Sequence, residues 1–291
     1  INESIRSQIN MIMNSSECKH IIISGQPGIG KTSCVKCIAN EMLGLDKNNM
    51  LLEINTTEET YVKNITTTLN TFCKSVSTNT ELKKIVILDE ADLLTQKSQN
   101  EILNKIKEYG HEVHFFLTCN DSTRIIENIQ SLSRIIHFPL LSRIDVTNVL
   151  KKICVIEAVT YNESSLDTLF EISQGDLRKA INNLQLVSVS GKINDANIYK
   201  ICCFPDPNEI KLLLRHCQDK NIKGMIEDVN KLLSSGYNYQ DILNCFNRVF
   251  TENNSDLKYL ELVHKTKVLT INLKTKLQLY NFVFKISEFM N

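Results

Sequence analysis

Short apolar runs recur along the first half of the chain, and longer amphipathic stretches separate them. Such runs, bounded by turn residues, are typical of buried parallel strands, whereas apolar residues at helical spacing indicate helices. The runs predict strands over 20–24, 50–54, 84–88, 113–118 and 135–138. The amphipathic stretches predict helices over 31–43, 61–72 and 98–109, the first of them ended by Gly44. This alternation predicts an α/β domain with a parallel sheet covered by helices on both faces.

The pattern changes at Pro139, after which only helical periodicity is found. Ser142 and Asp145 have the form of a capping box, which predicts a helix through about residue 155. Pro205 and Pro207 mark a later break. Further helices are predicted over 164–173, 176–189, 209–216, 222–233 and 239–250. We therefore expect three domains: an α/β domain over 1–139, a small helical domain over 140–204 and an all-helical domain over 205–291.

The composition fits an ordinary globular protein, with 42% hydrophobic and 23% charged residues. The 33 Lys and Arg residues balance the 33 Asp and Glu residues. Any basic surface for nucleic acid must therefore be a local patch or come from partner subunits. No apolar run approaches the roughly 18 residues that span a membrane, so no membrane partner is expected. The chain begins at Ile1 without a targeting segment, and the missing Met suggests that further sequence precedes it.

Ten cysteines are present, and only Cys34 and Cys37 have Cys-x-x-Cys spacing. No second pair or nearby histidine completes a zinc site. The neighbours Cys202 and Cys203 cannot form a disulfide without strain. We expect reduced, mostly buried thiols in a reducing compartment.

Residues 25–32, GQPGIGKT, fit the G-x-x-x-x-G-K-[ST] phosphate-binding loop. Glycines let successive backbone N–H groups surround phosphate oxygens, and the helix that follows adds the positive end of its dipole. Lys31 is expected to reach the β- and γ-phosphates, and the Thr32 hydroxyl to bind Mg²⁺. A glycine-rich turn without a ligand is the alternative, but the loop follows a predicted strand and opens a predicted helix. The residues expected to bind nucleotide here are Gly25, Gln26, Pro27, Gly28, Ile29, Gly30, Lys31, Thr32 and Ser33.

A pair of acids ends the apolar run in the sequence ILDEAD, residues 87–92. Carboxylates at the end of a buried strand are unfavourable unless they have a partner there, and this edge of a parallel sheet faces the phosphate-binding loop. Asp89 is expected to hold Mg²⁺, and Glu90 to orient and polarise the attacking water. Asp92 is expected to cap the next helix.

Two further polar residues are candidates for the same site. Asn120 follows the strand FFLT, where its amide could bond the water or the γ-phosphate; a simple polar turn is the alternative. Arg178 lies in the first turn of a predicted helix, where the dipole disfavours a cation and an anionic partner is therefore expected. A solvated surface arginine is the alternative for Arg178.

These motifs resemble those of the replication factor C small subunits, which are AAA+ ATPases. GQPGIGKT, ILDEAD, TCNDSTRIIENIQS and GDLRKAINNLQ occur in the family's order and spacing, across residues 1–186 and more weakly beyond. The resemblance implies that residues 1–139 are an AAA+ P-loop ATPase domain, 140–204 a helical lid and 205–291 a collar that joins subunits in a pentameric ring. It implies ATP and Mg²⁺ as cofactors, and an ATPase activity that depends on neighbouring subunits.

The resemblance also implies a function. ATP binding would let a heteropentameric clamp loader open a sliding clamp and place it on primer–template DNA in replication and repair, in the nucleus, and hydrolysis would release the loader. Asn120 corresponds to the first sensor of the family, and Arg178 to the second sensor, which reaches the γ-phosphate from the lid. Both residues therefore become expected catalytic residues, together with Lys31 and Glu90.

The segment before the last strand departs from the family pattern. The family has Ser-Arg-Cys where this chain has Ser131, Leu132 and Ser133. That arginine normally acts in trans, as an arginine finger on the ATP of the neighbouring subunit, and a leucine cannot stabilise phosphoryl charge. Arg134 lies two positions further on. If the strand begins at Ser133, Arg134 shares a face with Leu132 and could replace the missing finger.

Two more departures concern communication and adenine binding. Leu103 and Asn104 stand where the family has paired arginines in the helix after ILDEAD. The N-terminal strap that helps to enclose adenine in the family would lie before Ile1. These departures leave the chain's own nucleotide site complete but alter the residues that it would supply to the neighbouring subunit.

Two alternative functions follow from these residues. Leu132 favours a structural ring subunit that binds ATP without supplying a finger. Another AAA+ loader of DNA replication, or a Holliday-junction motor, would carry a winged helix with strands after Pro205, where the pattern here is helical.

The candidates for DNA contact are Lys97, Lys105 and Lys107. The alternative is that these lysines simply form the solvated face of a helix.

Overall fold

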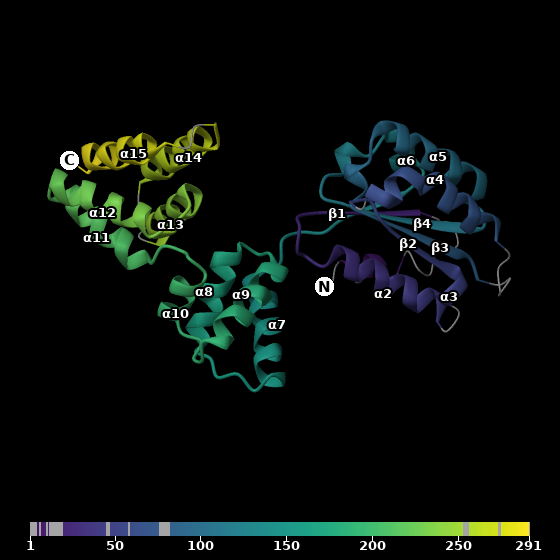
Figure 1. Ribbon diagram of the computed structural model, residues 1–291, viewed down its shortest axis with the longest axis horizontal. Coiled ribbons are helices and arrows are strands. Elements are labelled where there is room, and N and C mark those ends of the chain that lie inside the picture. Colours follow the sequence, from purple (N-terminus) through teal and green to yellow (C-terminus); the bar gives the residue numbers. More distant parts are fainter. Residues whose placement is uncertain are drawn as a thin grey trace. The chain divides into compact units, whose positions relative to one another are not determined.

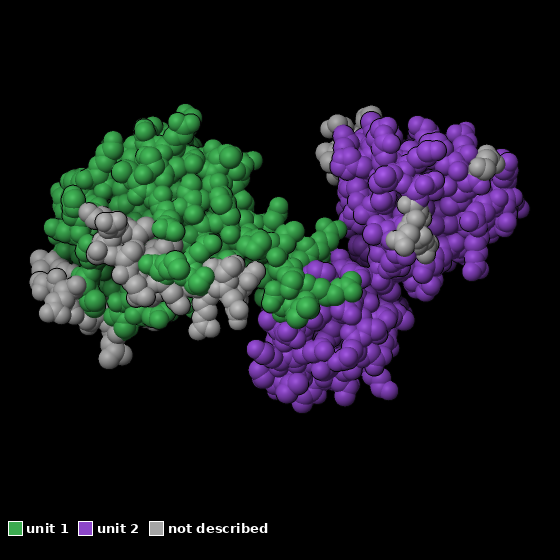
Figure 2. All heavy atoms as spheres, turned by 180° about the vertical axis from the view of Figure 1, so that it is seen from behind, with its two compact units in different colours: residues 1–146, 173–179 green, residues 147–172, 180–291 purple. Residues whose placement is uncertain are grey.

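The chain forms two compact units in the structure, a computed structural model that describes residues 5, 7–9, 11, 20–44, 47–57, 59–75, 82–252, 256–272 and 275–290. The first unit comprises residues 1–146 and 173–179, and the second comprises 147–172 and 180–291 (Figure 2). The three-domain division at residues 139 and 204 stays a prediction. No described helix is both long and apolar enough to cross a membrane.

A five-stranded parallel sheet is the centre of the first unit (Figure 1). Its strands are β1 (His20–Ser24), β2 (Leu51–Asn55), β3 (Lys84–Asp89), β4 (Val113–Cys119) and β5 (Arg134–His137). They lie in the order β2-β3-β4-β1-β5. The apolar runs predicted these strands to within one residue at each end, because strands buried on both faces consist of continuous apolar sequence.

Helices cover both faces of this sheet, as the strand–helix alternation predicted. The labelled helices that lie wholly in the first unit are α2 (Lys31–Leu43), α3 (Lys47–Met50), α4 (Glu59–Lys74), α5 (Gln96–Tyr109) and α6 (Glu127–Ser131). One face packs against α2 in a core that includes Ile21, Ile23 and Val35. The other face packs against α4, α5 and α6 in a core that includes Ile22 and Ile102 (Figure 1). Successive β1 residues therefore enter opposite cores, as the pleat requires.

The second unit is helical in its described residues, apart from a single bridge between Tyr161 and Ile193. Its helices are α7 (Arg143–Ile156), α8 (Glu163–Ser173), α9 (Leu177–Val189), α10 (Asp195–Ile201), α11 (Pro207–Gln218), α12 (Ile222–Ser234), α13 (Tyr239–Glu252), α14 (Leu257–Asn272) and α15 (Lys276–Phe289). The first turns of α7 and α9 belong to the first unit. No strand occurs in the described part of residues 205–290, so that part lacks the strand pair of a winged helix.

Local chemistry explains where these helices begin. The Ser142 hydroxyl accepts the Asp145 backbone N–H at 3.1 Å, as the predicted capping box requires of its first residue, and it also donates to Asp145 Oδ2 at 2.6 Å. Asp206 accepts the Asn208 N–H at 2.9 Å, and Pro207 occupies the first helical position of α11, where no N–H is needed. Each start satisfies donors that the helix itself leaves free.

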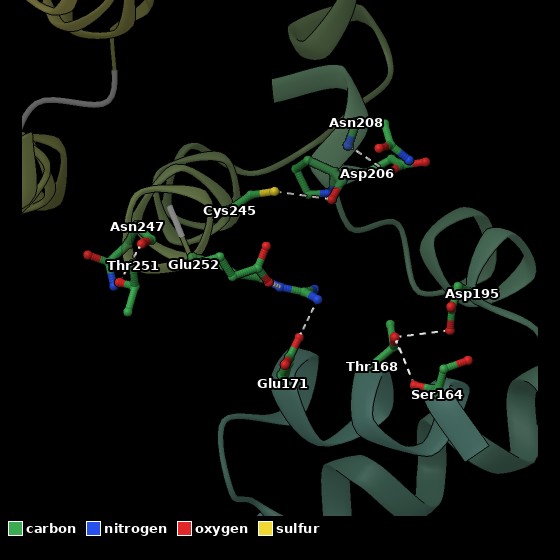
Figure 3. A network of polar contacts seen from close by, with 12 residues as sticks. Ser164, Thr168, Glu171, Asp195, Asp206, Asn208, Cys245, Asn247, Thr251 and Glu252 are labelled. Carbon is green, nitrogen blue, oxygen red and sulfur yellow. Dashed lines mark hydrogen bonds and ion pairs between the residues drawn. The ribbon is translucent and has the colours of Figure 1, made fainter. Parts of the chain in front are cut away.

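An arginine on α13, Arg248, joins the helices before Pro205 to those after it within the second unit. Two of its partners, Glu171 and Glu252, are labelled in Figure 3. The Arg248 guanidinium lies 2.6 Å from Glu171 Oε2 on α8 and 2.8 Å from Glu252 Oε1 on its own helix. It also donates to the Tyr199 hydroxyl on α10 at 2.8 Å. These charged contacts raise the pKa of Arg248 against the opposing effect of its burial. The Arg248 guanidinium therefore contacts side chains of α8 and α10 as well as one of its own helix α13.

Replacing Arg248 with Ala should lower the free energy of unfolding by about 2–3 kcal/mol, because Glu171 would keep a half-buried charge without its cation. The measurement is urea unfolding of the full chain, followed by circular dichroism. Arg215→Ala removes an exposed arginine from α11 of the same unit and should change stability by less than about 0.5 kcal/mol. Equal effects of the two substitutions would contradict this role for Arg248.

Candidate functional site

The phosphate-binding loop connects β1 to α2 and has the conformation that its glycines allow. Gly28 and Gly30 have φ angles of 73° and 91°, in the left-handed region that favours glycine. Gly28 also lies against Asp176, since a Cβ at Gly28 would be 1.8 Å from the Asp176 carboxylate. Helix α2 begins at Lys31, directly after Gly30. Its free N-terminal N–H groups and dipole therefore face the loop, as an anion site requires.

Lys31 is buried and points back along this loop. Its ammonium donates to the carbonyl oxygens of Gly25 and Gln26, both at 2.8 Å, and to Asn120 Oδ1 at 3.0 Å. Burial lowers the pKa of Lys31, and the neighbouring acids oppose that shift only in part. A bound triphosphate would supply the negative charge that this buried cation lacks.

Asp89 ends β3 beside the loop. The Thr32 hydroxyl donates to Asp89 Oδ1 at 2.8 Å, and the Thr118 hydroxyl of β4 donates to the same oxygen. Thr32 and Asp89 lie 57 residues apart in the sequence, and this contact joins the two motifs that the sequence predicted to share a site. A hydroxyl and a carboxylate are oxygen ligands of the kind that Mg²⁺ prefers, so the donor set fits that cation.

Glu90 has an unusual backbone conformation for a residue other than glycine. Its φ and ψ are 57° and 41°, in the left-handed region, which costs about 1 kcal/mol or more. Two threonines hold this conformation. The Glu90 N–H donates to Thr118 Oγ1 at 3.1 Å, and the Thr56 hydroxyl donates to the Glu90 carbonyl at 2.7 Å. The backbone of Glu90 is therefore held both from the turn after β2 and from β4.

The predicted role of Asp92 as a helix cap is wrong. Thr95 caps α5 instead, accepting the Ser98 N–H at 3.3 Å. Asp92 lies in a short 3-10 helix, η1 (Ala91–Leu93), and its buried carboxylate accepts the Asn120 N–H at 3.2 Å. Because the next helix begins only at Gln96, Asp92 is too early to cap it and instead anchors the backbone of Asn120.

Asn120 and Arg178 both reach the hollow beside the loop. Asn120 lies just after β4 and accepts from Lys31, as described above. Arg178 is exposed, in the first turn of α9, and lines the same hollow. The Leu177 N–H donates to the Gly28 carbonyl at 3.1 Å, which brings this turn of α9 to the loop. The hollow is lined by Pro27, Gly28, Gly30, Lys31, Thr32, Ser33, Asp89, Glu90, Thr118, Cys119, Asn120 and Arg178.

Three predicted loop residues do not line that hollow, namely Gly25, Gln26 and Ile29. Gly25 and Gln26 instead provide the carbonyl oxygens that hold Lys31. Ile29 is buried in the core beneath the loop. Their contribution to nucleotide binding stays a prediction.

Sequence reasoning missed Thr56, Thr118 and Asp176 as neighbours of the site. Thr118 had a detectable signal, because it is a hydroxyl in an otherwise apolar segment of strand, two residues before Asn120. Thr56 follows the second strand, where the carboxyl ends of parallel strands meet. Asp176 gave no such signal, because only the fold brings α9 to Gly28.

The cysteines of the described chain are free thiols, and most of them are buried, as predicted. Cys119 lines the hollow, and burial raises its pKa to about 11. Burial likewise raises the pKa of Cys34 on α2 to about 11. These thiols therefore stay protonated at neutral pH and are poor nucleophiles.

The sequence predicts that Arg134 could act as the arginine finger if it shares a strand face with Leu132. The structure contradicts that shared strand. Leu132 ends α6 with φ and ψ of −89° and −5°, and the strand begins only at Arg134. The two residues therefore do not alternate along one strand, and the argument that they share a face fails. Both side chains are exposed, Leu132 at 44%.

The remaining candidates lie on α5. Leu103 is buried in the sheet–helix core, whereas Asn104 is exposed. The Lys105 ammonium lies 2.6 Å from Glu108 and 5.6 Å from the centre of the Tyr109 ring, so its charge already has partners. Lys97 and Lys107 are exposed, which is compatible both with DNA contact and with the solvated face of a helix.

Known proteins resemble this chain along nearly all of its length. Residues 21–140 match the ATPase family associated with various cellular activities (AAA), and residues 205–285 match the replication factor C C-terminal domain. The chain is 40% identical to a putative replication factor C small subunit of Acanthamoeba polyphaga mimivirus, over 98% of this chain and 91% of that protein. It is 32% identical to replication factor C subunit 4 of Schizosaccharomyces pombe, over 99% and 86%.

An archaeal protein and a solved structure extend the comparison. The replication factor C small subunit of Sulfurisphaera tokodaii is 31% identical over 89% of this chain and 80% of its own length. The Thermotoga maritima RuvB Holliday junction branch migration motor has a TM-score of 0.54 over 87% of this chain and 88% of its own. At 16% identity that likeness shows the fold alone. From the sequence relatives and both domain matches, the chain belongs to the replication factor C small subunits, a family of AAA+ ATPases.

Proposed function

We propose that this chain binds and hydrolyses ATP as one subunit of a hetero-oligomeric clamp loader, which opens a sliding clamp and places it on primer–template DNA. The observation that carries the nucleotide chemistry is the hydrogen bond from Thr32 to Asp89 Oδ1, which joins the phosphate-binding loop to the acidic pair. The role in clamp loading rests on membership of the replication factor C family.

The residues divide the chemistry of hydrolysis between them. The loop amides and Lys31 would bind the phosphates, with Asn120 and Arg178 near the γ-phosphate. Thr32 and Asp89 would hold Mg²⁺, which when bound neutralises charge on the phosphate oxygens. Glu90 would accept a proton from the attacking water and orient it in line with the bond that breaks. Burial of Lys31 strengthens its attraction to phosphate, because less water screens the charge.

The partners follow from the family and are part of the same proposal. Sibling subunits would form the ring with this chain through the helices of residues 205–285, which match the replication factor C C-terminal domain. Sliding clamp and DNA are proposed from the family role, and Lys97 and Lys107 are exposed candidates for DNA contact. A nuclear location also stays a proposal, because the relatives include a viral and an archaeal protein.

A second candidate function is a ring subunit that binds ATP mainly for assembly. The exposed Leu132 favours it, since no guanidinium stands at that position to act on a neighbouring ATP. The two candidates differ in one respect: the first requires turnover at this chain's own site.

Lys31→Ala should weaken ATP binding roughly 100-fold, because about 3 kcal/mol of charged contacts to phosphate is lost. The measurement is titration of the full chain with a fluorescent ATP analogue. Lys36→Ala is the matched control, because Lys36 is an exposed lysine on the same helix, paired with Glu53 at 2.5 Å. Normal ATP affinity in Lys31→Ala would refute the phosphate-binding assignment.

Glu90→Gln should keep ATP binding and reduce turnover by roughly 10²–10⁴-fold, because the amide cannot accept the proton of the attacking water. Single-turnover hydrolysis of radiolabelled ATP by the chain, co-purified with its sibling subunits, measures the rate. Turnover at this site supports the first candidate. If the unsubstituted complex and its Glu90→Gln variant hydrolyse ATP at the same rate, the assembly role is favoured instead.

Leu132→Arg should raise hydrolysis at the neighbouring site, by up to roughly 10³-fold, if the missing finger limits the rate there. The ATPase rate of the assembled ring measures this effect. Leu132→Lys is the control, because lysine adds the charge without the planar fork of arginine. Arg134→Ala in the unsubstituted background completes the test: a fall in rate there, with no gain from Leu132→Arg, would show that Arg134 acts in its place.

A further inference from the structure

Thr118 carries a buried hydroxyl at the hollow of the first unit. It belongs to β4, follows Phe115, Phe116 and Leu117, and is only 1% exposed. Burying a hydroxyl is unfavourable unless it is hydrogen-bonded. The burial of this hydroxyl is therefore explained by its hydrogen-bond partners.

Both partners of Thr118 belong to the acidic pair. Asp89 Oδ1 can only accept when ionised and a backbone N–H can only donate, so the direction of each bond is determined. The Thr118 hydroxyl must donate to Asp89 and accept the N–H of Glu90, the latter at 3.1 Å. One side chain thus contacts the carboxylate of the first acid and the backbone of the second.

The backbone of Glu90 gives an independent reason to consider Thr118. Glu90 is held in the left-handed region, where a residue other than glycine stays only if its surroundings fix it. Its N–H is bound by Thr118 and its carbonyl by Thr56. Without the bond to Thr118, the N–H would lose its partner and the peptide could turn, which would re-aim the Glu90 side chain.

We propose that Thr118 is a positioning residue for ATP hydrolysis, which sets Asp89 toward Thr32 and aims Glu90 at the attacking water. This inference rests on the proposed roles of Asp89 and Glu90. Thr118 itself would touch neither the water nor the γ-phosphate, and its effect passes through the two acids. Loss of the Thr118 hydroxyl should therefore change the rate of ATP hydrolysis and the Mg²⁺ concentration that it requires more than it changes the affinity for ATP.

The test is Thr118→Val, which keeps the shape of the side chain and removes its hydroxyl. The full chain is purified with its sibling subunits, and the complex carrying Lys31→Ala gives the rate that is not due to this site. Above that baseline, kcat should fall about 10-fold or more, because two contacts to the acids are lost. KM for ATP should change less than about threefold, and half-maximal rate should require more free Mg²⁺.

Two controls separate positioning from a general loss of stability. Thr118→Ser restores a hydroxyl and should bring kcat back to within about threefold of the unsubstituted complex. Thr168→Val removes a buried hydroxyl that contacts the Asp195 carboxylate at 3.0 Å in the second unit (Figure 3). It should lower the thermal midpoint and leave kcat unchanged. Thr118→Cys, with a weaker donor, replaces the valine variant if that chain does not assemble.

The outcomes are distinct. A normal kcat in Thr118→Val, with Lys31→Ala inactive, overturns the positioning role and leaves the proposed function standing. Equal losses in Thr118→Val and Thr168→Val also overturn it, since any buried hydroxyl would then have the same effect. If Lys31→Ala leaves the rate of the complex unchanged, this site does not hydrolyse ATP, and both proposals fail.

Discussion

Asp89 Oδ1 is the atom on which the arrangement of the site depends, because it accepts hydroxyl hydrogens from two other parts of the chain. Thr32 donates from the first turn of α2, and Thr118 donates from β4. Two hydroxyl donors on one oxygen fix the direction in which this carboxylate points. The residues expected to bind phosphate, metal and water are therefore held around one point by the chain's own contacts.

The strand order makes this convergence possible. In the order β2-β3-β4-β1-β5, the loop after β1 and the acids after β3 are separated only by β4, which carries Thr118 and leads to Asn120. All strands are parallel, so their carboxyl ends lie at the same edge of the sheet. The buried Asp92 adds a second cross-connection, since it holds the backbone of Asn120. Every neighbour of the nucleotide site thus belongs to the first unit, including the turn that carries Arg178.

The site contrasts with the surface that this subunit would offer to a neighbour. The lysine, hydroxyl, acids and amide expected of a P-loop ATPase all line the hollow, where Lys31 contacts Asn120 and Thr32 contacts Asp89. Leu132 is exposed at the end of α6, at the position where the family resemblance implies an arginine. An exposed leucine contributes no charge to a phosphate, and Arg134 starts a separate element. The proposed function therefore combines the expected residues at this chain's own site with a leucine at the position that is expected to act on a neighbouring site.

Much of this could be predicted from the sequence, because it depends on local pattern. The strands are apolar runs buried on both faces, and Lys31, Thr32, Asp89 and Glu90 lie at fixed offsets from them, so spacing alone located the two motifs. Asn120 and Arg178 are candidates by their positions after a strand and at a helix start, the family resemblance makes them expected catalytic residues, and the fold brings both to the same hollow.

Only the tertiary structure decided which polar groups meet. The sequence predicts that Asp92 caps α5, the next α-helix, yet its partner is the backbone of Asn120, 28 residues away and just after β4. Thr118 and Thr56 acquire their roles from strand pairing, and Leu132 is separated from Arg134 by the end of α6. Hydrogen bonds between strands depend on register and on backbone angles that no local spacing specifies.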